Sequence, residues 1–205
     1  MKRKPSIGLI DTGTSNIRSV NYALNEFNVE VKYIKESTEK NMDAIVVPGI
    51  GSFEHVMNKL KKEKLDKLII EKIQKIPSLF ICVGMQILFT ESFEFGKHLG
   101  LNLFKGKVKK IDEKKRKAPF IGWNQVNLQK KCEIFQDIKK NEFFYFTHSY
   151  YVIPEDKQII SSETNYLDFK YCSSISKDNI FATQFHPEKS GKEGLKIYKN
   201  FINLI

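Results

Sequence analysis

The sequence has no long apolar run of the kind that crosses a membrane. Its 205 residues contain no uninterrupted stretch of about 18 apolar residues, the length that a transmembrane helix needs. The N-terminal segment is basic, but its apolar run, residues 7–10, ends at Asp11, and no cleavage site of small residues follows. Neither a membrane protein nor a secretory signal is expected, and we predict a cytoplasmic protein.

Cysteine is scarce, and its three instances are Cys82, Cys132 and Cys172. An odd number of cysteines without the short paired spacing of zinc ligands favours neither a disulfide framework nor a metal site. In a reducing cytoplasm the thiols stay free, so any of them is available as a nucleophile. We therefore expect no metal and no cofactor.

Acidic residues are too few to balance the basic ones: 24 aspartates and glutamates face 34 lysines and arginines, which leaves a formal net charge of +10. A basic excess can mark a nucleic-acid-binding protein. Here the lysines are scattered and many alternate with glutamate, as in residues 61–64, and the densest cluster, residues 105–117, has only Phe104 nearby as a stacking aromatic. The pattern favours a general lysine bias, or a face that docks an acidic partner protein, over nucleic-acid binding.

The first half of the chain alternates between strand and helix patterns. Four apolar segments are expected strands, and they are residues 7–10, 29–34, 44–47 and 78–81. Between them, residues 17–27 and a lysine-rich segment with Leu65, Leu68 and Ile69 show the apolar spacing of helices. This alternation predicts an α/β fold with a central, mostly parallel sheet and helices on both faces. Functional loops should lie beyond the carboxyl ends of the strands.

The second half is built from shorter segments of β character. Residues 143–146, 150–153 and 180–185 are expected strands, and residues 194–202 form an amphipathic helix. They predict a smaller antiparallel β portion in the second half. Nothing indicates a second domain, and 41% hydrophobic residues suffice for one substantial core, so residues 1–205 are expected to form a single domain.

Cys82 is the candidate nucleophile. An apolar strand leads into it, and a helix pattern leaves it through Gln86, Leu88 and Phe89. A nucleophile on a sharp turn between strand and helix is presented outward, and the backbone N–H groups of the helix start lower a thiol pKa and can bind an oxyanion. The alternative is a buried structural cysteine.

A nucleophilic thiol needs a base, and the base needs a group that orients it. His186 ends an apolar strand, and Glu188, two residues later, is placed to bond the far ring nitrogen and hold the useful tautomer. His148 is the rival base, but no acidic residue lies near it in sequence, so a binding or structural role suits it better. Gly49 and Gly51 follow a strand and could present N–H groups to an oxyanion; a plain turn is the alternative.

These segments together resemble the class I glutamine amidotransferase family. Residues 82–86 (Cys-Val-Gly-Met-Gln) are similar to its nucleophile motif, and residues 185–190 (Phe-His-Pro-Glu-Lys-Ser) to its His-x-Glu motif. Four further segments resemble the glutaminase subunits of imidazole glycerol phosphate synthases in particular, and they are residues 10–20, 48–53, 122–124 and 145–150. The resemblance extends over nearly the whole chain.

The resemblance implies a glutaminase that hydrolyses glutamine through a Cys82 thioester. Released ammonia would pass into a (β/α)8-barrel cyclase subunit, which makes imidazole glycerol phosphate in histidine biosynthesis. It also implies roles for further residues: oxyanion stabilisation for Gly49, Ile50, Gly51 and Val83, glutamine binding for Gln86, His148, Ser149 and Tyr150, and contact with the synthase for Trp123 and Asn124. The oxyanion donors are expected to need the partner to set their geometry. A core position is the alternative for Trp123.

The chain departs from the family pattern at several positions. Phe80 stands where the family usually has glycine, two residues before the nucleophile, and Phe120 stands where it usually has histidine. Near the start, Thr12 and Ser15 replace a usual aromatic residue and glycine. Two alternatives therefore stay open: a paralogue that supplies ammonia to a different synthase, for instance one that amidates a surface sugar, and a catalytically impaired scaffold subunit.

Overall fold

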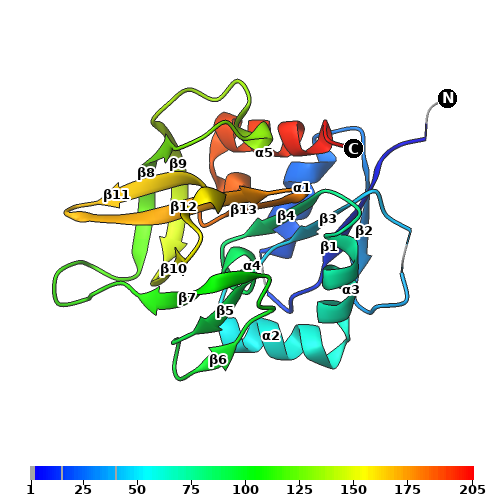
Figure 1. The fold of residues 1–205 in the computed structure, drawn as a ribbon. Coiled ribbons are helices and arrows are strands. Elements are labelled where there is room, and N and C mark those ends of the chain that lie inside the picture. Colours follow the sequence, from blue (N-terminus) through cyan, green and yellow to red (C-terminus); the bar gives the residue numbers. More distant parts are fainter. Residues whose placement is uncertain (1–2, 15, 40) are drawn as a thin grey trace.

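A computed structural model describes residues 3–14, 16–39 and 41–205. Ser15, one of the departures named above, lies outside the described residues, as do Met1 and Lys2 of the basic start. The fold has a central nine-stranded sheet, with helices α1 and α5 on one side of it and α2 and α3 on the other, and a second, four-stranded sheet beside it (Figure 1). The predicted α/β architecture is confirmed.

The central sheet has the strand order β2-β1-β3-β4-β13-β12-β11-β8-β9. Five of these strands form the parallel part, and they are β1 (Ser6–Ile10), β2 (Glu30–Ile34), β3 (Ala44–Val47), β4 (Ser78–Ile81) and β13 (Ile180–Thr183). The other four run antiparallel, and they are β8 (Phe120–Leu128), β9 (Glu142–His148), β11 (Ile160–Tyr166) and β12 (Phe169–Lys177). The antiparallel portion expected in the second half thus continues the parallel sheet.

The parallel strands β3, β4 and β13 are apolar except for Ser78 and Thr183 because helices cover both of their faces. Every residue of β3, β4 and β13 is buried. The strands predicted at residues 44–47 and 78–81 have these bounds in the structure. Phe80 is one of the largest fully buried side chains, so the departure from glycine at this position is absorbed by the core.

The helices differ from the prediction in several places: α1 ends at Asn25 and not at residue 27, α5 begins at Gly191 and not at residue 194, and two further differences concern α2, α3 and α4. Their bounds are α1 (Ile17–Asn25), α2 (Phe53–Lys62), α3 (Leu65–Lys72), α4 (Val83–Gln86) and α5 (Gly191–Ile202), with 3-10 turns η1 (Glu133–Phe135), η2 (Lys157–Ile159) and η3 (Pro187–Lys189). The lysine-rich segment was expected to form one helix but forms two, α2 and α3. They are separate because Lys64 has a left-handed backbone conformation, with φ +58°. The helix expected to continue to Phe89 stops at Gln86.

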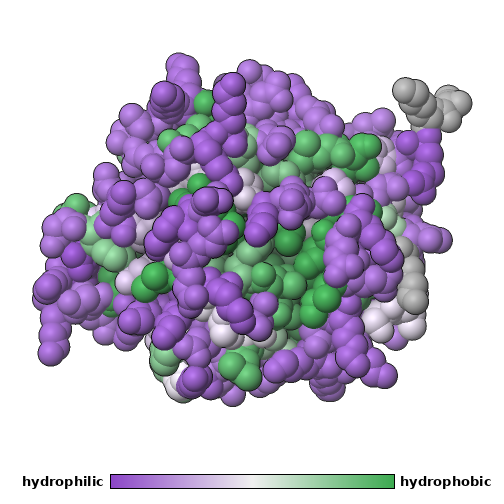
Figure 2. Space-filling view, viewed as in Figure 1, coloured by the Kyte–Doolittle hydropathy of each residue, from purple (hydrophilic) through white to green (hydrophobic). Residues whose placement is uncertain are grey.

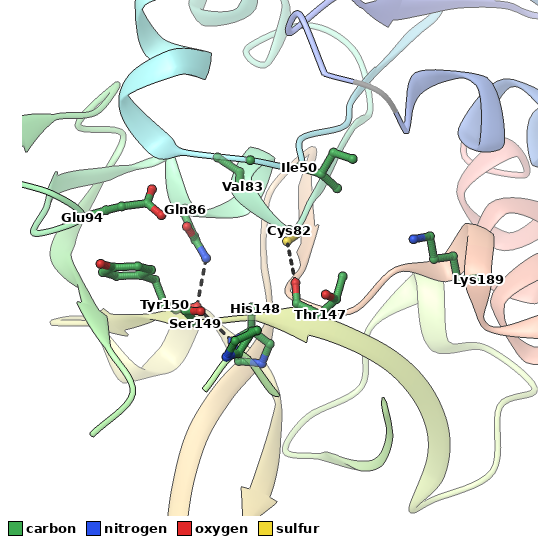
Figure 3. A pocket seen from close by; sticks show the side chains of 12 residues that line it. Ile50, Cys82, Val83, Gln86, Glu94, Thr147, His148, Ser149, Tyr150 and Lys189 are labelled. Atoms are coloured by element: carbon green, nitrogen blue, oxygen red, sulfur yellow. Dashed lines mark hydrogen bonds between the residues drawn. The ribbon is translucent and has the colours of Figure 1, made fainter. Parts of the chain in front are cut away.

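A second sheet packs beside the first and carries the order β10-β7-β5-β6. Its strands are β5 (Phe89–Ser92), β6 (His98–Leu99), β7 (Phe104–Lys110) and β10 (Tyr150–Pro154). Between β9 and β10 lies Ser149 alone, so the chain passes from one sheet to the other within a residue. This change of direction places residues 147–150 at the edge of a cavity below Cys82 (Figure 3).

Polar side chains dominate the surface, in keeping with the basic composition. Figure 2 shows hydrophilic residues over most of the face seen in Figure 1, with apolar ones gathered near its middle. None of the helices in the described ranges combines the length and the apolar character needed to span a membrane.

Candidate active site

Cys82 lies on the sharp turn that the sequence predicts between β4 and α4. Its backbone has φ +55° and ψ −109°, an unusual conformation for a residue with a side chain. The turn is tight because Gly84 meets β3: a Cβ on Gly84 would lie 2.2 Å from the Val47 carbonyl oxygen. Any side chain at position 84 would therefore push the turn away from the sheet. The helix that follows is a single turn, so its N-terminal field is weaker than the sequence suggested.

His186 and Glu188 form a buried pair at the end of β13. His186 Nδ1 lies 2.8 Å from Glu188 Oε1, and both side chains are completely buried. Asn16 Nδ2 donates to the same carboxylate oxygen at 3.1 Å. The 3-10 turn η3, which begins with Pro187, brings the carboxylate back onto the ring. The orienting contact predicted between residues 186 and 188 is present.

The electrostatics of this pair indicate a charged histidine. Burial acts to lower the pKa of His186, but the neighbouring Cys82, as a negative charge and as a hydrogen-bond partner, and then Glu188 raise it to about 10. The pKa of Glu188 is lowered, because its contacts with His186 outweigh the effect of burial. His186 Nε2 makes no hydrogen bond of ordinary geometry within the described chain, so sulfur and ring are close without being fully aligned. The arrangement suits a thiolate–imidazolium pair.

Gln184 is a neighbour of the sulfur that sequence reasoning missed. Its Nε2 lies 3.5 Å from Cys82 Sγ, and the Thr147 carbonyl oxygen lies 3.9 Å from the same sulfur. The signal was present, because residues two apart in extended chain share a face, and Gln184 precedes His186 by two. The Gln184 amide nitrogen is therefore placed to donate a hydrogen bond to the sulfur.

His148 is not available as a base. Its Nδ1 bonds the Tyr150 carbonyl oxygen at 2.9 Å, and its Nε2 lies 3.2 Å from the Tyr171 hydroxyl. Burial, with the charge of His186, outweighs the Tyr150 contact and lowers the pKa of His148 to about 4. The ring is therefore neutral near pH 7, as a structural or binding role requires.

The expected oxyanion donors are not assembled in this conformation. The Val83 N–H donates to the Gly49 carbonyl oxygen at 3.2 Å, so it is already satisfied. Gly51 adopts φ +100° and has open space beside it. Rotation of the peptide between Gly49 and Ile50 would withdraw that carbonyl, release the Val83 N–H and turn the Ile50 N–H to the side where the carbonyl oxygen now lies.

A cavity of about 360 Å³ opens beside Cys82 (Figure 3). Eight of the residues predicted to act as nucleophile, to bind the oxyanion or to bind glutamine line this cavity. They are Ile50, Gly51, Cys82, Val83, Gln86, His148, Ser149 and Tyr150. Thr147, Pro119, Lys189 and Glu94 also line it. The Gln86 amide nitrogen bonds the Tyr150 carbonyl oxygen at 3.0 Å and Gln184 Oε1 at 3.1 Å. Gln86 thereby ties the strand that bears residues 147–150 to the floor of the cavity.

Among the described residues that line the cavity, Glu94 is the one carboxylate, and sequence reasoning missed it. It is buried and accepts the Phe53 N–H at the start of α2. Burial raises its pKa, while the Phe53 N–H and then His98 act in the opposite direction. Its sequence neighbours, Phe93 and Phe95, are both exposed, so no periodicity marked the residue between them as buried.

Trp123, one of the two residues predicted to contact a synthase, lies on the outer face of the β8–β9 hairpin. Trp123 is 53% exposed, with Ile121 at 60% and Phe143 at 46%. The core position considered for Trp123 is therefore wrong. Trp123 pairs with Tyr145, whose ring it meets edge-on at 6.1 Å. Asn124 points to the other face, where its Nδ2 donates to the Asn165 carbonyl oxygen at 2.7 Å.

Comparisons with known proteins agree with one another. Residues 8–204 match the family "Glutamine amidotransferase class-I". The imidazole glycerol phosphate synthase subunit HisH of Pyrococcus furiosus is 43% identical over 199 residues, which cover 97% of this chain and 98% of that protein. The subunit of the same name from Methanocaldococcus jannaschii is 43% identical over 203 residues, covering 97% and 100%.

Solved structures show the same fold at lower identity. PurLQS from Thermotoga maritima superposes with a TM-score of 0.76 at 18% identity, covering 98% of this chain and 99% of that chain. A glutamine amidotransferase superposes with a TM-score of 0.72 at 13% identity, covering 97% of both.

Proposed function

Because the chain belongs to the class I glutamine amidotransferase family, we propose that it is the glutaminase subunit of an imidazole glycerol phosphate synthase in histidine biosynthesis. It hydrolyses glutamine to glutamate and ammonia and passes the ammonia to a (β/α)8-barrel cyclase subunit. The observation that carries this proposal is the buried His186–Glu188 pair beside Cys82 at the cavity. The central sheet draws strands from both ends of the chain, which supports a single domain over residues 1–205.

The chemistry follows from the charges of the pair. The Cys82 thiolate attacks the side-chain amide carbon of glutamine, and His186 gives its proton to the departing nitrogen, which leaves as ammonia. A thioester to Cys82 remains. His186, now neutral, takes a proton from water, the resulting hydroxide cleaves the thioester, and glutamate departs. Glu188 holds the ring and stabilises its positive charge throughout.

The oxyanion site supplies a prediction about the partner. In the described conformation Val83 has its N–H bonded to Gly49, so the isolated chain should hydrolyse glutamine slowly. A synthase that drives the rotation of the Gly49–Ile50 peptide should raise kcat roughly 100-fold or more, since that is what an oxyanion donor contributes. Glutaminase rates measured with and without saturating partner test this. Equal rates would contradict it.

Glu94 is placed to recognise the α-ammonium group of glutamine. No other carboxylate lines the cavity in the part of the chain that the structure describes, and a buried carboxylate gains most from a cationic partner. Glu94→Gln should raise KM roughly 10- to 100-fold, the value of a charge-assisted hydrogen bond, and change kcat little. The matched control is Glu91→Gln on β5, three residues earlier, where the carboxylate pairs with Lys97 and Lys107. Similar KM values for the two variants would remove Glu94 from substrate recognition.

The outer face of the β8–β9 hairpin is the proposed docking surface for the synthase. Its exposed apolar residues are Ile121, Trp123 and Phe143, and β9 continues from it to Thr147 on the cavity wall. Ammonia leaving Cys82 would therefore emerge beside the bound partner, shielded from water. Tyr145 extends the same surface. Lys189 partly covers it, and the Lys189 Nζ lies 5.7 Å from the centre of the Tyr145 ring.

Trp123→Ala should weaken the complex by about 30-fold or more, the cost of removing a central aromatic anchor. The matched control is Tyr33→Ala on β2, an aromatic residue that is 45% exposed and lies at the opposite edge of the central sheet. Titration of labelled partner gives both dissociation constants. If Trp123→Ala binds as tightly as the wild type, the partner docks elsewhere.

Two alternatives are separated by simple assays. For a paralogue that serves another synthase, the complex would hydrolyse glutamine but form no imidazole glycerol phosphate from the phosphoribosyl aminoimidazole substrate. Phe120 is the observation that keeps the paralogue alternative open. This residue replaces the usual histidine, and the centre of its ring lies 4.5 Å from the centre of the Tyr166 ring. A catalytically impaired scaffold would not react with a glutamine-analogue electrophile at Cys82.

A further inference from the structure

One oxygen of the Glu188 carboxylate is accounted for and the other is not. Glu188 Oε1 accepts hydrogen bonds from both His186 Nδ1 and Asn16 Nδ2. Oε2 is buried and has no hydrogen bond of ordinary geometry to any described residue. A buried, charged carboxylate with an unsatisfied oxygen is costly, so a donor is expected within reach.

Tyr198 is the donor that the structure places there. Its side chain is fully buried on α5, and its hydroxyl also lacks a partner of ordinary geometry in the described part of the chain. Burial raises the pKa of this phenol well above its usual range, and the charge of Glu188 together with a hydrogen bond to it acts in the same direction. The hydroxyl is therefore protonated, close to the carboxylate and able to donate.

The backbone explains why Tyr198 reaches this position. Helix α5 approaches η3 through Gly194, where a Cβ would lie 1.9 Å from the Pro187 carbonyl oxygen. Residues 194 and 198 are four apart and share one face of the helix. The face that carries Tyr198 is thus pressed against the turn that carries Glu188.

We propose that Tyr198 is a positioning residue of the glutaminase site, whose hydroxyl donates to Glu188 Oε2 and fixes the plane of the carboxylate against His186. The proposal rests on the proposed function of the Cys82, His186 and Glu188 group. With only Oε1 held, the carboxylate can turn about its bond to the side chain, and the imidazole loses its fixed orientation. A second donor on Oε2 removes that freedom.

Tyr198→Phe removes the hydroxyl and keeps the ring. We expect kcat for glutamine hydrolysis by the complex to fall roughly tenfold, the effect of one lost hydrogen bond to a charged group, with KM unchanged. Synthesis driven by free ammonium should be unaffected, because it bypasses this site. Tyr198→Leu, which lacks the hydroxyl and also alters the packing, should show the same kcat within about twofold, although its unfolding temperature should be lower.

Asn200→Ser is the matched control on the same helix. Asn200 Nδ2 donates to the Ile134 and Gln136 carbonyl oxygens, away from Glu188. This variant should unfold at a lower temperature and retain kcat. Unchanged kcat in Tyr198→Phe, or losses of kcat that follow the unfolding temperatures of all three variants, would overturn the proposal. An inactive wild-type complex would instead refute the proposed function.

Discussion

Replacing Cys82 with alanine should lower glutamine hydrolysis by at least about 10,000-fold, the scale of losing a catalytic nucleophile. The sulfur is the atom that forms the thioester, and no other described thiol lines the cavity. Synthesis from free ammonium should persist, because the partner's chemistry does not need the thioester. The measurement is a paired assay of the complex with glutamine and with an ammonium salt.

Cys132→Ala is the matched control for this variant. Cys132 is also a free, partly buried cysteine, and burial raises its pKa, so it has no feature of a nucleophile. Its loss should leave both assays near the wild-type rate. Persistent glutamine hydrolysis in Cys82→Ala would refute the assignment of the nucleophile.

Replacing His186 with asparagine should lower kcat/KM by about 1,000-fold or more, since both steps need proton transfer at Nε2. Asparagine retains a donor toward Glu188 but cannot exchange a proton. Glu188→Gln, which keeps the shape of the side chain and removes its charge, should cost less because the acid and base remain. Steady-state rates of the three complexes test this order. Equal losses in the two variants would show that His186 matters only through its contact with Glu188.

The role of His186 as an acid also predicts the direction in which activity changes with pH. The pKa of His186 is raised to about 10, so the ring keeps its proton through neutral pH and loses it as the pH rises through about 10. Wild-type kcat/KM should fall in that range as the acid is lost, and His186→Asn should lack this limb. The contribution of His186 to stability follows the same direction: it is complete below the ordinary histidine pKa and is lost as the pH rises through about 10, whereas that of Glu188, whose pKa is lowered, is lost in acid.

The sequence predicted those parts of the fold whose burial is uniform. β3 is apolar throughout and β4 is apolar after Ser78, and their bounds follow from the sequence alone. The separation of α2 from α3 at Lys64 could not be predicted, because nothing in the local sequence marks a lysine that takes a left-handed conformation. The helix after Cys82 was overextended because Leu88 and Phe89 are buried whether they continue a helix or, as here, lead into β5.

The site divides in the same way. Cys82, His186 and Glu188 stand at the ends of predictable strands, so their type and spacing sufficed to group them. The contact of Glu94 with the start of α2 joins residues far apart along the chain, and the proposed role of Tyr198 depends on how α5 packs against η3. Such contacts depend on how the layers pack, which one sequence does not reveal. Whether the predicted oxyanion donors are available depends in addition on the orientation of one peptide, between Gly49 and Ile50.

The central claim is that Cys82, His186 and Glu188 converge to activate one sulfur. Its most direct test is to treat the assembled complex with a diazoketone analogue of glutamine and map the adduct by mass spectrometry. The account predicts one covalent adduct, on Cys82, that forms much more slowly in His186→Asn. No adduct, an adduct on Cys132 or Cys172, or equal labelling in the two proteins would contradict it.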